Sequence, residues 1–143
     1  MQKKGFTLIE LLVVIAIMAL LSTLAVVALS SARQKSRDAK RLADIKQVQT
    51  ALELYFIDQN AYPAGDALVL GEATAKCLGA GGFAASDCTA PVYMGNIPAN
   101  PTPGGADYAY TVSGTSYSIN FTLEGANGGL ALGAHTASPA GIQ

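Results

Sequence analysis

The chain has 143 residues, of which 50% are hydrophobic and 13% are charged, and its formal net charge is −1. This composition is too apolar for an ordinary soluble domain and too polar for a protein with several membrane spans, so it predicts one membrane segment joined to one small globular part. The near-neutral charge does not favour a large surface for binding nucleic acid.

An uncharged, strongly apolar stretch covers residues 11–32. As an α-helix it would be roughly 33 Å long, which matches the hydrocarbon thickness of a bilayer. A secretory signal peptide is the alternative, with Lys3 and Lys4 as its basic region, but the apolar stretch is longer than such a peptide needs. Glu10 also fits a signal peptide poorly. A carboxylate inside a bilayer costs about 2.5–3.5 kcal/mol, and such residues are usually functional.

A second helical pattern follows directly, because residues 33–58 contain neither glycine nor proline. The larger apolar residues in this segment recur at steps of three and four: Leu42, Ile45, Val48, Leu52, Tyr55 and Phe56. This spacing predicts that the apolar helix continues without a break into an amphipathic helix. Asn60 and Pro63 are expected to end it.

The rest of the chain predicts a small antiparallel sheet. Residues 108–112 and 117–124 alternate between apolar and polar side chains, and the turn around Gly114 suits a hairpin. Residues 128–133 are expected to add a short last strand, whereas residues 66–107 and the C-terminal tail show no period. The predicted fold class is α+β, with the stripe from Leu42 to Phe56 covering the apolar face of the sheet.

Two cysteines, Cys77 and Cys88, lie close together in a segment rich in Gly, Ala and Ser. A structural disulfide is the favoured interpretation, since no histidine is nearby for a metal site and the spacing is not that of a C-x-x-C redox pair. His135 is a lone histidine in a predicted loop, and Asn120 begins a glycosylation sequon of a kind that often arises by chance. No residue constellation indicates an enzyme, a metal site or a cofactor.

Basic residues follow the apolar stretch closely: Arg33, Lys35, Arg37, Lys40 and Arg41. A count of Lys and Arg alone would place the C-terminal part in the cytoplasm, whereas a disulfide favours an oxidising compartment. We interpret the basic residues as a solvated helix face at the membrane edge, where Asp38 and Asp44 pair locally. A binding site for lipid or DNA phosphates is the alternative.

The N-terminal sequence KGFTLIELLVVIAI resembles that of prepilins, the precursors of type IV pilins and of the pseudopilins of type II secretion. The later segments ALELYFIDQNAYP and YSINFTLE are also similar to pilins. The resemblance implies a pilin-like fold and cleavage between Gly5 and Phe6 by a prepilin peptidase, followed by N-methylation of Phe6. It also implies that the Glu10 carboxylate pairs with the new amine of a neighbouring subunit during assembly.

This resemblance divides the chain into a leader at residues 1–5, a membrane and filament-core helix at 6–32, an amphipathic helix at 33–59 and a globular head at 60–143. Two features differ from many relatives. The middle of the apolar helix has no proline or glycine, and residues 123–135 contain only Glu124 where many major pseudopilins carry an acidic calcium-binding loop.

The expected function is that of a structural subunit of a type IV pilus-like filament. The expected partners are further copies of the subunit, the prepilin peptidase and an inner-membrane assembly platform. The subunit should span the inner membrane once, with its head outside, before it joins an extracellular or periplasmic filament. The alternatives are a major pseudopilin of type II secretion and a minor pilin for adhesion or DNA uptake, although binding of nucleic acid is not expected.

Overall fold

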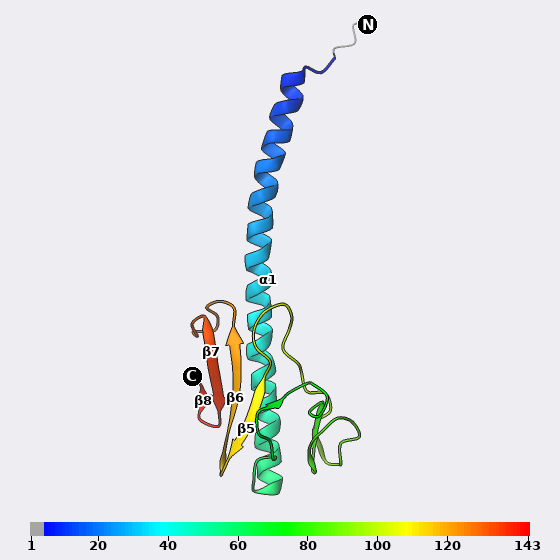
Figure 1. The fold of residues 1–143 in the computed structure, drawn as a ribbon, viewed down its shortest axis with the longest axis vertical. Helices are drawn as coiled ribbons and strands as arrows, with labels where there is room; N and C mark the ends of the chain where they lie inside the picture. The colour runs from blue at the N-terminus through cyan, green and yellow to red at the C-terminus, as the bar shows by residue number, and fades with distance from the viewer. Residues whose placement is uncertain (1–4) are drawn as a thin grey trace. The chain divides into compact units, whose positions relative to one another are not determined.

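The computed structural model describes residues 5–143, so Lys3, Lys4 and most of the predicted leader lie outside the described residues. The elements are one helix, α1 (Leu8–Gln59), and eight strands, β1 (Leu68–Val69), β2 (Cys77–Gly79), β3 (Gly82–Ala84), β4 (Val92–Met94), β5 (Ala109–Ser113), β6 (Ser116–Leu123), β7 (Gly133–Ser138) and β8 (Gly141–Ile142) (Figure 1). The predicted α+β class, a long N-terminal helix with antiparallel sheet, is confirmed.

Helix α1 runs for 52 residues without interruption, as the absence of glycine and proline predicted. It ends where the backbone of Asn60 takes a positive φ of 55°. The Asn60 N–H donates to the carbonyl of Phe56 at 2.8 Å, which satisfies one of the free carbonyls of the last turn. Pro63 follows and cannot continue a helix, so the end of α1 is fixed by local chemistry.

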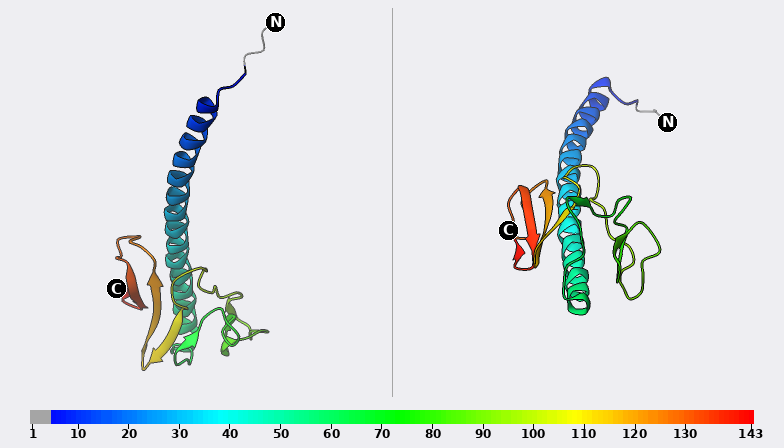
Figure 2. Two further views of the ribbon diagram at one scale, coloured as in Figure 1. Left: turned by 45° about the horizontal axis from the view of Figure 1, so that its top comes forward. Right: turned by 60° about the horizontal axis from the view of Figure 1, so that its bottom comes forward.

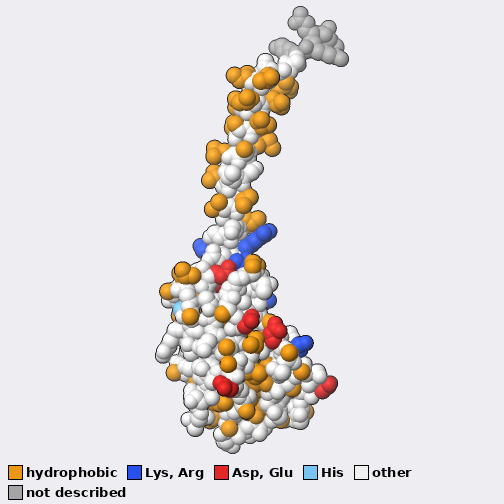
Figure 3. Space-filling view, in the orientation of Figure 1, with side chains coloured by type: hydrophobic (Ala, Val, Ile, Leu, Met, Phe, Trp, Pro, Cys, Tyr) orange, Lys and Arg blue, Asp and Glu red, His pale blue; other side chains and the backbone are white. Residues whose placement is uncertain are grey.

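The chain forms two compact units, residues 1–34 and residues 35–143. In the first unit the large hydrophobic side chains of α1 are exposed from Leu8 to Leu29, as is Phe6 just before the helix (Figure 3). Within the described residues, α1 is the one helix that is long and apolar enough to cross a membrane. This part of the helix therefore presents an apolar surface on all sides, which is the pattern expected for a helix surrounded by lipid or by other helices.

The second unit is a head in which β1–β5–β6–β7–β8 form one antiparallel sheet against the C-terminal part of α1 (Figures 1 and 2). The side chains of β6 alternate between buried and more exposed along the whole strand, as predicted. The buried ones, including Ile119 and Phe121, face the stripe of α1 that contains Ile45, Val48 and Leu52. The sheet and helix thus bury their apolar faces against each other.

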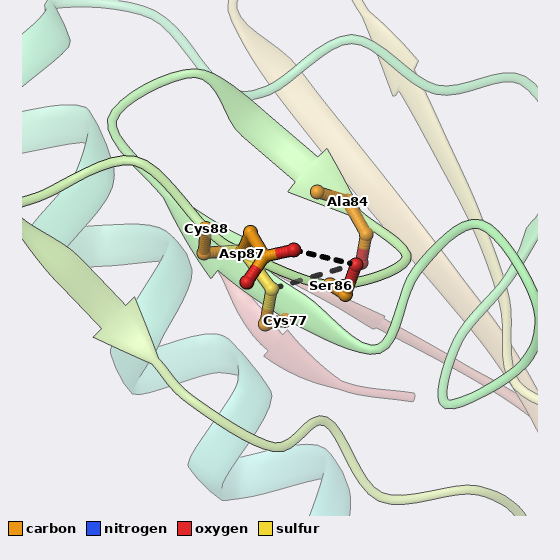
Figure 4. The surroundings of a disulfide bond; sticks show 5 residues. All are labelled: Cys77, Ala84, Ser86, Asp87 and Cys88. Atoms are coloured by element: carbon orange, nitrogen blue, oxygen red, sulfur yellow. Dashed lines mark hydrogen bonds between the residues drawn. A yellow bond between two sulfur atoms is a disulfide. The ribbon is translucent and has the colours of Figure 1, made fainter.

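A second, three-stranded sheet, β3–β2–β4, combines two strands of the glycine- and alanine-rich segment with β4 from the stretch that follows it. Cys77 at the start of β2 forms a disulfide with Cys88, and their Cα atoms are 6.1 Å apart (Figure 4). The ring of Phe83 in β3 meets the ring of Tyr110 in β5 edge-on, with 4.9 Å between ring centroids. This contact attaches the disulfide-closed hairpin to the main core of the head.

Several strands differ from the sequence-based expectation. The strand expected at residues 128–133 is misplaced: this segment contains only an isolated bridge between Asn127 and Leu130, and β7 begins at Gly133. The tail, which shows no period, forms most of β7 and all of β8. In β7 only Ala137 is buried, so backbone pairing with β6 defines the strand and leaves almost no hydrophobic signal in the sequence.

We predict that replacing Cys77 and Cys88 together by alanine lowers the free energy of unfolding by about 2–3 kcal/mol, because the reduced unfolded chain regains the entropy of a short loop. Chemical denaturation of the detergent-solubilised chain, followed by tyrosine fluorescence, measures this change. Reductant should destabilise the wild type by a similar amount and leave the double variant unaffected. Equal stability of the oxidised wild type and the double variant would contradict this role for the disulfide.

Candidate functional site

The predicted cleavage site lies in exposed, non-helical chain immediately before α1. Gly5 and Phe6 are outside regular structure, and the Phe6 side chain is 88% exposed. An ideal Cβ built on Gly5 would meet nothing within 4 Å. The peptide bond between these residues is therefore accessible in the way that a peptidase substrate requires.

Glu10 caps the start of α1 through a reciprocal pair of hydrogen bonds with Thr7. The Glu10 N–H donates to Oγ1 of Thr7 at 3.3 Å, while Oε2 of Glu10 accepts the Thr7 N–H at 2.8 Å. The Thr7 hydroxyl also donates to Oε2, at 2.8 Å. This is a capping box, and it gives Glu10 a local structural role that the sequence analysis did not identify.

Glu10 also lines an open apolar groove of about 380 Å³ together with Phe6, Ile9, Val13 and Val14, and its carboxylate lies next to this groove. The hydrogen bonds among the described residues use only Oε2, so Oε1 remains available to a further donor. A carboxylate near the helix N-terminus is favoured by the helix dipole. The site thus combines a negative group with an apolar surface, which suits a cationic group carried on another apolar segment.

A second polar site lies in the head, around the fully buried side chain of Arg41. Every N–H of its guanidinium donates a hydrogen bond. The acceptors are Oδ1 of Asn100 (2.7 Å), Oδ1 of Asp38 (2.7 Å), Oε1 of Glu124 (2.7 Å), the Pro101 carbonyl (2.8 Å) and the Gly104 carbonyl (2.6 Å). We call these residues, with Arg37, the arginine cluster. It joins α1 to the loop after β4 and to the end of β6.

Glu124 is the shared acid of the arginine cluster. Arg37 donates from Nε to Oε1 at 2.8 Å and also forms an ion pair with Oε2. Hydrogen bonds from Arg37, with further support from Arg41, lower the pKa of Glu124 from its ordinary value of 4.5 to about 2. Glu124 is the one acid of residues 123–135, the segment where many major pseudopilins carry a calcium-binding loop. Here its cationic partners are guanidinium groups.

Asp38 completes the cluster by accepting backbone N–H groups. Its Oδ1 accepts from Glu124 at 3.0 Å and its Oδ2 accepts from Gly125 at 2.9 Å. The backbone turns tightly around the cluster at Gly104 and Gly105, whose φ angles are 88° and 73°. A Cβ on Gly105 would lie 2.8 Å from Nε of Arg41, so glycine is needed for this close approach.

The interpretation of residues 33–41 as a solvated helix face is wrong for Arg37, Arg41 and Asp38. Loops far away in the sequence cover these side chains, and helical periodicity carries no information about such loops. Asp44 is also buried and accepts a hydrogen bond from the Tyr108 hydroxyl at 3.2 Å, and burial raises its pKa. The only sequence signal for the cluster is the unusual PTPGG loop, which by itself indicates a turn.

The remaining candidate residues do not assemble into a reactive site. His135 lies near two backbone carbonyls, with Nε2 2.8 Å from the Ala131 oxygen and Nδ1 3.1 Å from the Gln143 oxygen. Asn120 accepts a hydrogen bond from the Thr136 hydroxyl on the outer sheet face. In residues 5–143, no three His, Cys, Asp or Glu side chains are grouped so that they could hold a metal ion.

An exposed apolar helix, capped by a glutamate and followed by a small helix-on-sheet head, defines the class of filament-forming proteins with a pilin-like fold. Residues 1–26 match the family model described as the prokaryotic N-terminal methylation motif. The type II secretion system core protein G of Pseudomonas aeruginosa is 31% identical over 127 residues, which cover 89% of this chain and 86% of that protein. The chain belongs to the family of type II secretion pseudopilins and type IV pilins.

Other relatives match less than half of the chain. Core protein G of Pectobacterium carotovorum is 38% identical over 63 residues, or 44% of this chain and 40% of that protein. The type IV wide pilus major component PilA4 of Thermus thermophilus is 40% identical over 67 residues, or 47% of this chain and 51% of that protein. The chain thus spans about half the length of these relatives. No solved structure matches the chain.

We predict that Glu124→Gln destabilises the head at neutral pH and removes part of its sensitivity to acid. A lowered carboxylate pKa stabilises the fold above the unfolded-state pKa, and this contribution is lost as the pH falls through the folded-state value. The stability difference between wild type and variant should therefore be about 2 kcal/mol or more at pH 7 and shrink between about pH 5 and pH 2.

Chemical denaturation of the detergent-solubilised chain across this pH range measures the difference. Asp66→Asn is the matched control, because the Asp66 side chain is exposed. A difference between wild type and Glu124→Gln that stays constant with pH would contradict the assigned role of the ion pairs.

Proposed function

We propose that the chain is a structural subunit of a type IV pilus-like filament, which polymerises through residues 6–32 after the leader has been removed. The observation that carries this proposal is the exposed apolar part of α1, with Glu10 at its start. The match to the N-terminal methylation motif and the similarity to a pilus component and a secretion-system core protein support it.

The first step of the proposal is processing at the membrane. A prepilin peptidase cuts between Gly5 and Phe6, and the new N-terminus is methylated at Phe6. Residues 6–32 then hold the subunit in the inner membrane, with the head on the outer side, until an assembly platform extracts it. The Cys77–Cys88 disulfide supports this orientation, because disulfides persist in oxidising compartments.

Cleavage makes the role of Glu10 intelligible. It creates a cationic amine on Phe6, and the Glu10 carboxylate of an adjacent subunit can pair with that amine once the two helices lie side by side. Within residues 5–143 of the single subunit, the carboxylate accepts hydrogen bonds from the N–H and the hydroxyl of Thr7. Because an isolated charge in an apolar environment is unfavourable, the new ion pair favours one axial register over others.

A major pseudopilin of type II secretion is the second candidate, since the relative that covers 89% of the chain is a core protein of such a system. Deletion of the gene distinguishes the two. Loss of surface fibres with normal protein export would support the pilus, whereas loss of export without loss of surface fibres would support the pseudopilus.

We predict that Glu10→Ala and Glu10→Gln both abolish filaments while cleavage after Gly5 continues. Glutamine can keep the capping box with Thr7 but cannot form an ion pair, so this variant separates the two roles of Glu10. Electron microscopy measures filament yield, and mass spectrometry of the N-terminus measures processing. Glu10→Asp should retain some filaments because it keeps the charge.

Normal filaments from Glu10→Gln would show that capping is the main role of Glu10 and would contradict the proposed ion pair. Loss of processing in Glu10→Ala would instead place the residue in peptidase recognition.

A further inference from the structure

The head carries a groove that none of the contacts described above explains. It lies between α1 and the end of the sheet that contains β8, and its volume is about 300 Å³. Its apolar walls include Leu42, Leu130 and Ile142, and Lys46 also lines it with an exposed side chain. We call it the Lys46 groove. Its size suits one or two apolar side chains rather than a cofactor.

Two features give the Lys46 groove a fixed shape. Nε2 of Gln49 donates to the Ser138 carbonyl at 2.8 Å, which ties α1 to the end of β7. Gly128, with a φ of 60°, brings its backbone so close to Leu42 that a Cβ would lie 2.8 Å from Leu42 Cδ1. The groove is therefore built by the fold and does not depend on long, mobile side chains.

The last two turns of α1 carry a projection of complementary character. Ile57 is 71% exposed and Leu54 is 48% exposed, although the opposite face of the same helix already supplies Leu52 to the core. The exposed acids Glu53 and Asp58 flank them, and each accepts one hydrogen bond within its own head, from the hydroxyls of Tyr62 and Tyr93 respectively. Residues three apart on a helix are neighbours, so Leu54 and Ile57 form one small apolar projection with an acidic border. We call it the Ile57 projection.

We propose that the Ile57 projection of one subunit docks into the Lys46 groove of the next subunit in the filament. The groove is apolar with a basic border and the projection is apolar with an acidic border, so the two are complementary in both character and charge. They are different surfaces of the same head. A contact between two different surfaces repeats from subunit to subunit and generates an open helical polymer, whereas a self-complementary surface would stop at a dimer.

The helix geometry adds a register. Lys46 and Glu53 are separated along α1 by roughly 10 Å, so parallel helices that bring them together are displaced axially by about that distance. The contact is small, and we assign it to specificity and register rather than to most of the assembly energy, which the apolar helices supply. This inference rests on the proposed function, since it requires that the chain polymerises.

Charge reversal in the full-length, membrane-expressed chain tests the contact. Lys46→Glu alone, and Glu53→Lys with Asp58→Lys, should each lower filament yield about tenfold, as expected for the loss of about 1.4 kcal/mol per contact. The triple variant, which swaps the charges, should recover most of the yield. Lys76→Glu is the matched control and should leave the yield unchanged, because the exposed Lys76 lies outside both surfaces.

Ile57→Ser tests the apolar part independently. The side chain is exposed, so the melting temperature of the head should stay the same while filament yield falls. Normal yield from Ile57→Ser, normal yield from Lys46→Glu, or a triple variant no better than its parents would overturn the docking contact while leaving the proposed function intact. An equal loss in Lys76→Glu would also overturn it. Failure of the wild-type chain to form any filament would overturn the proposed function, and this inference with it.

Discussion

The apolar surface of α1 between Leu8 and Leu29 is the constraint on which the rest of the molecule depends. The large hydrophobic side chains of this segment are exposed, and none of them belongs to the hydrophobic core of the head. Such a surface is stable only in lipid or against other apolar helices. A subunit with this helix must therefore be held in a membrane or in a polymer, and the proposed life cycle uses both in turn.

The C-terminal part of α1 is amphipathic, and a small sheet domain must pack firmly against it. The hydrogen bonds and ion pairs of the arginine cluster attach the loops to α1 close to the start of the head. Removing one partner of a buried guanidinium whose donors are all satisfied is strongly destabilising, because it leaves an uncompensated buried charge. Loop residues without regular structure, Asn100, Pro101 and Gly104, are thereby fixed to the helix.

Much of the architecture could be predicted from the sequence. The unbroken helix follows from the absence of glycine and proline, and the hairpin of β5 and β6 follows from strict alternation of apolar side chains. The arginine cluster could not be predicted, because its partners Glu124 and Gly104 lie far from Arg41 in the sequence. Strands such as β7, whose side chains are mostly small, are defined by pairing with a neighbour and leave no periodic signal.

The N-terminal motif predicts that Glu10 pairs with the amine of a neighbouring subunit, and the structure shows a second role, the capping box with Thr7. Both roles are compatible, because the cap occupies one carboxylate oxygen and leaves the other for a second donor. The proposed assembly therefore depends on what Glu10 contacts in the filament. A cryo-EM map of filaments formed by the wild-type chain measures this directly. We predict that the apolar part of α1 lies in the filament interior and that each Glu10 carboxylate lies within hydrogen-bonding distance of the Phe6 amine of a neighbouring subunit. Filaments held together by head contacts alone, with Glu10 facing solvent or only its own chain, would contradict it.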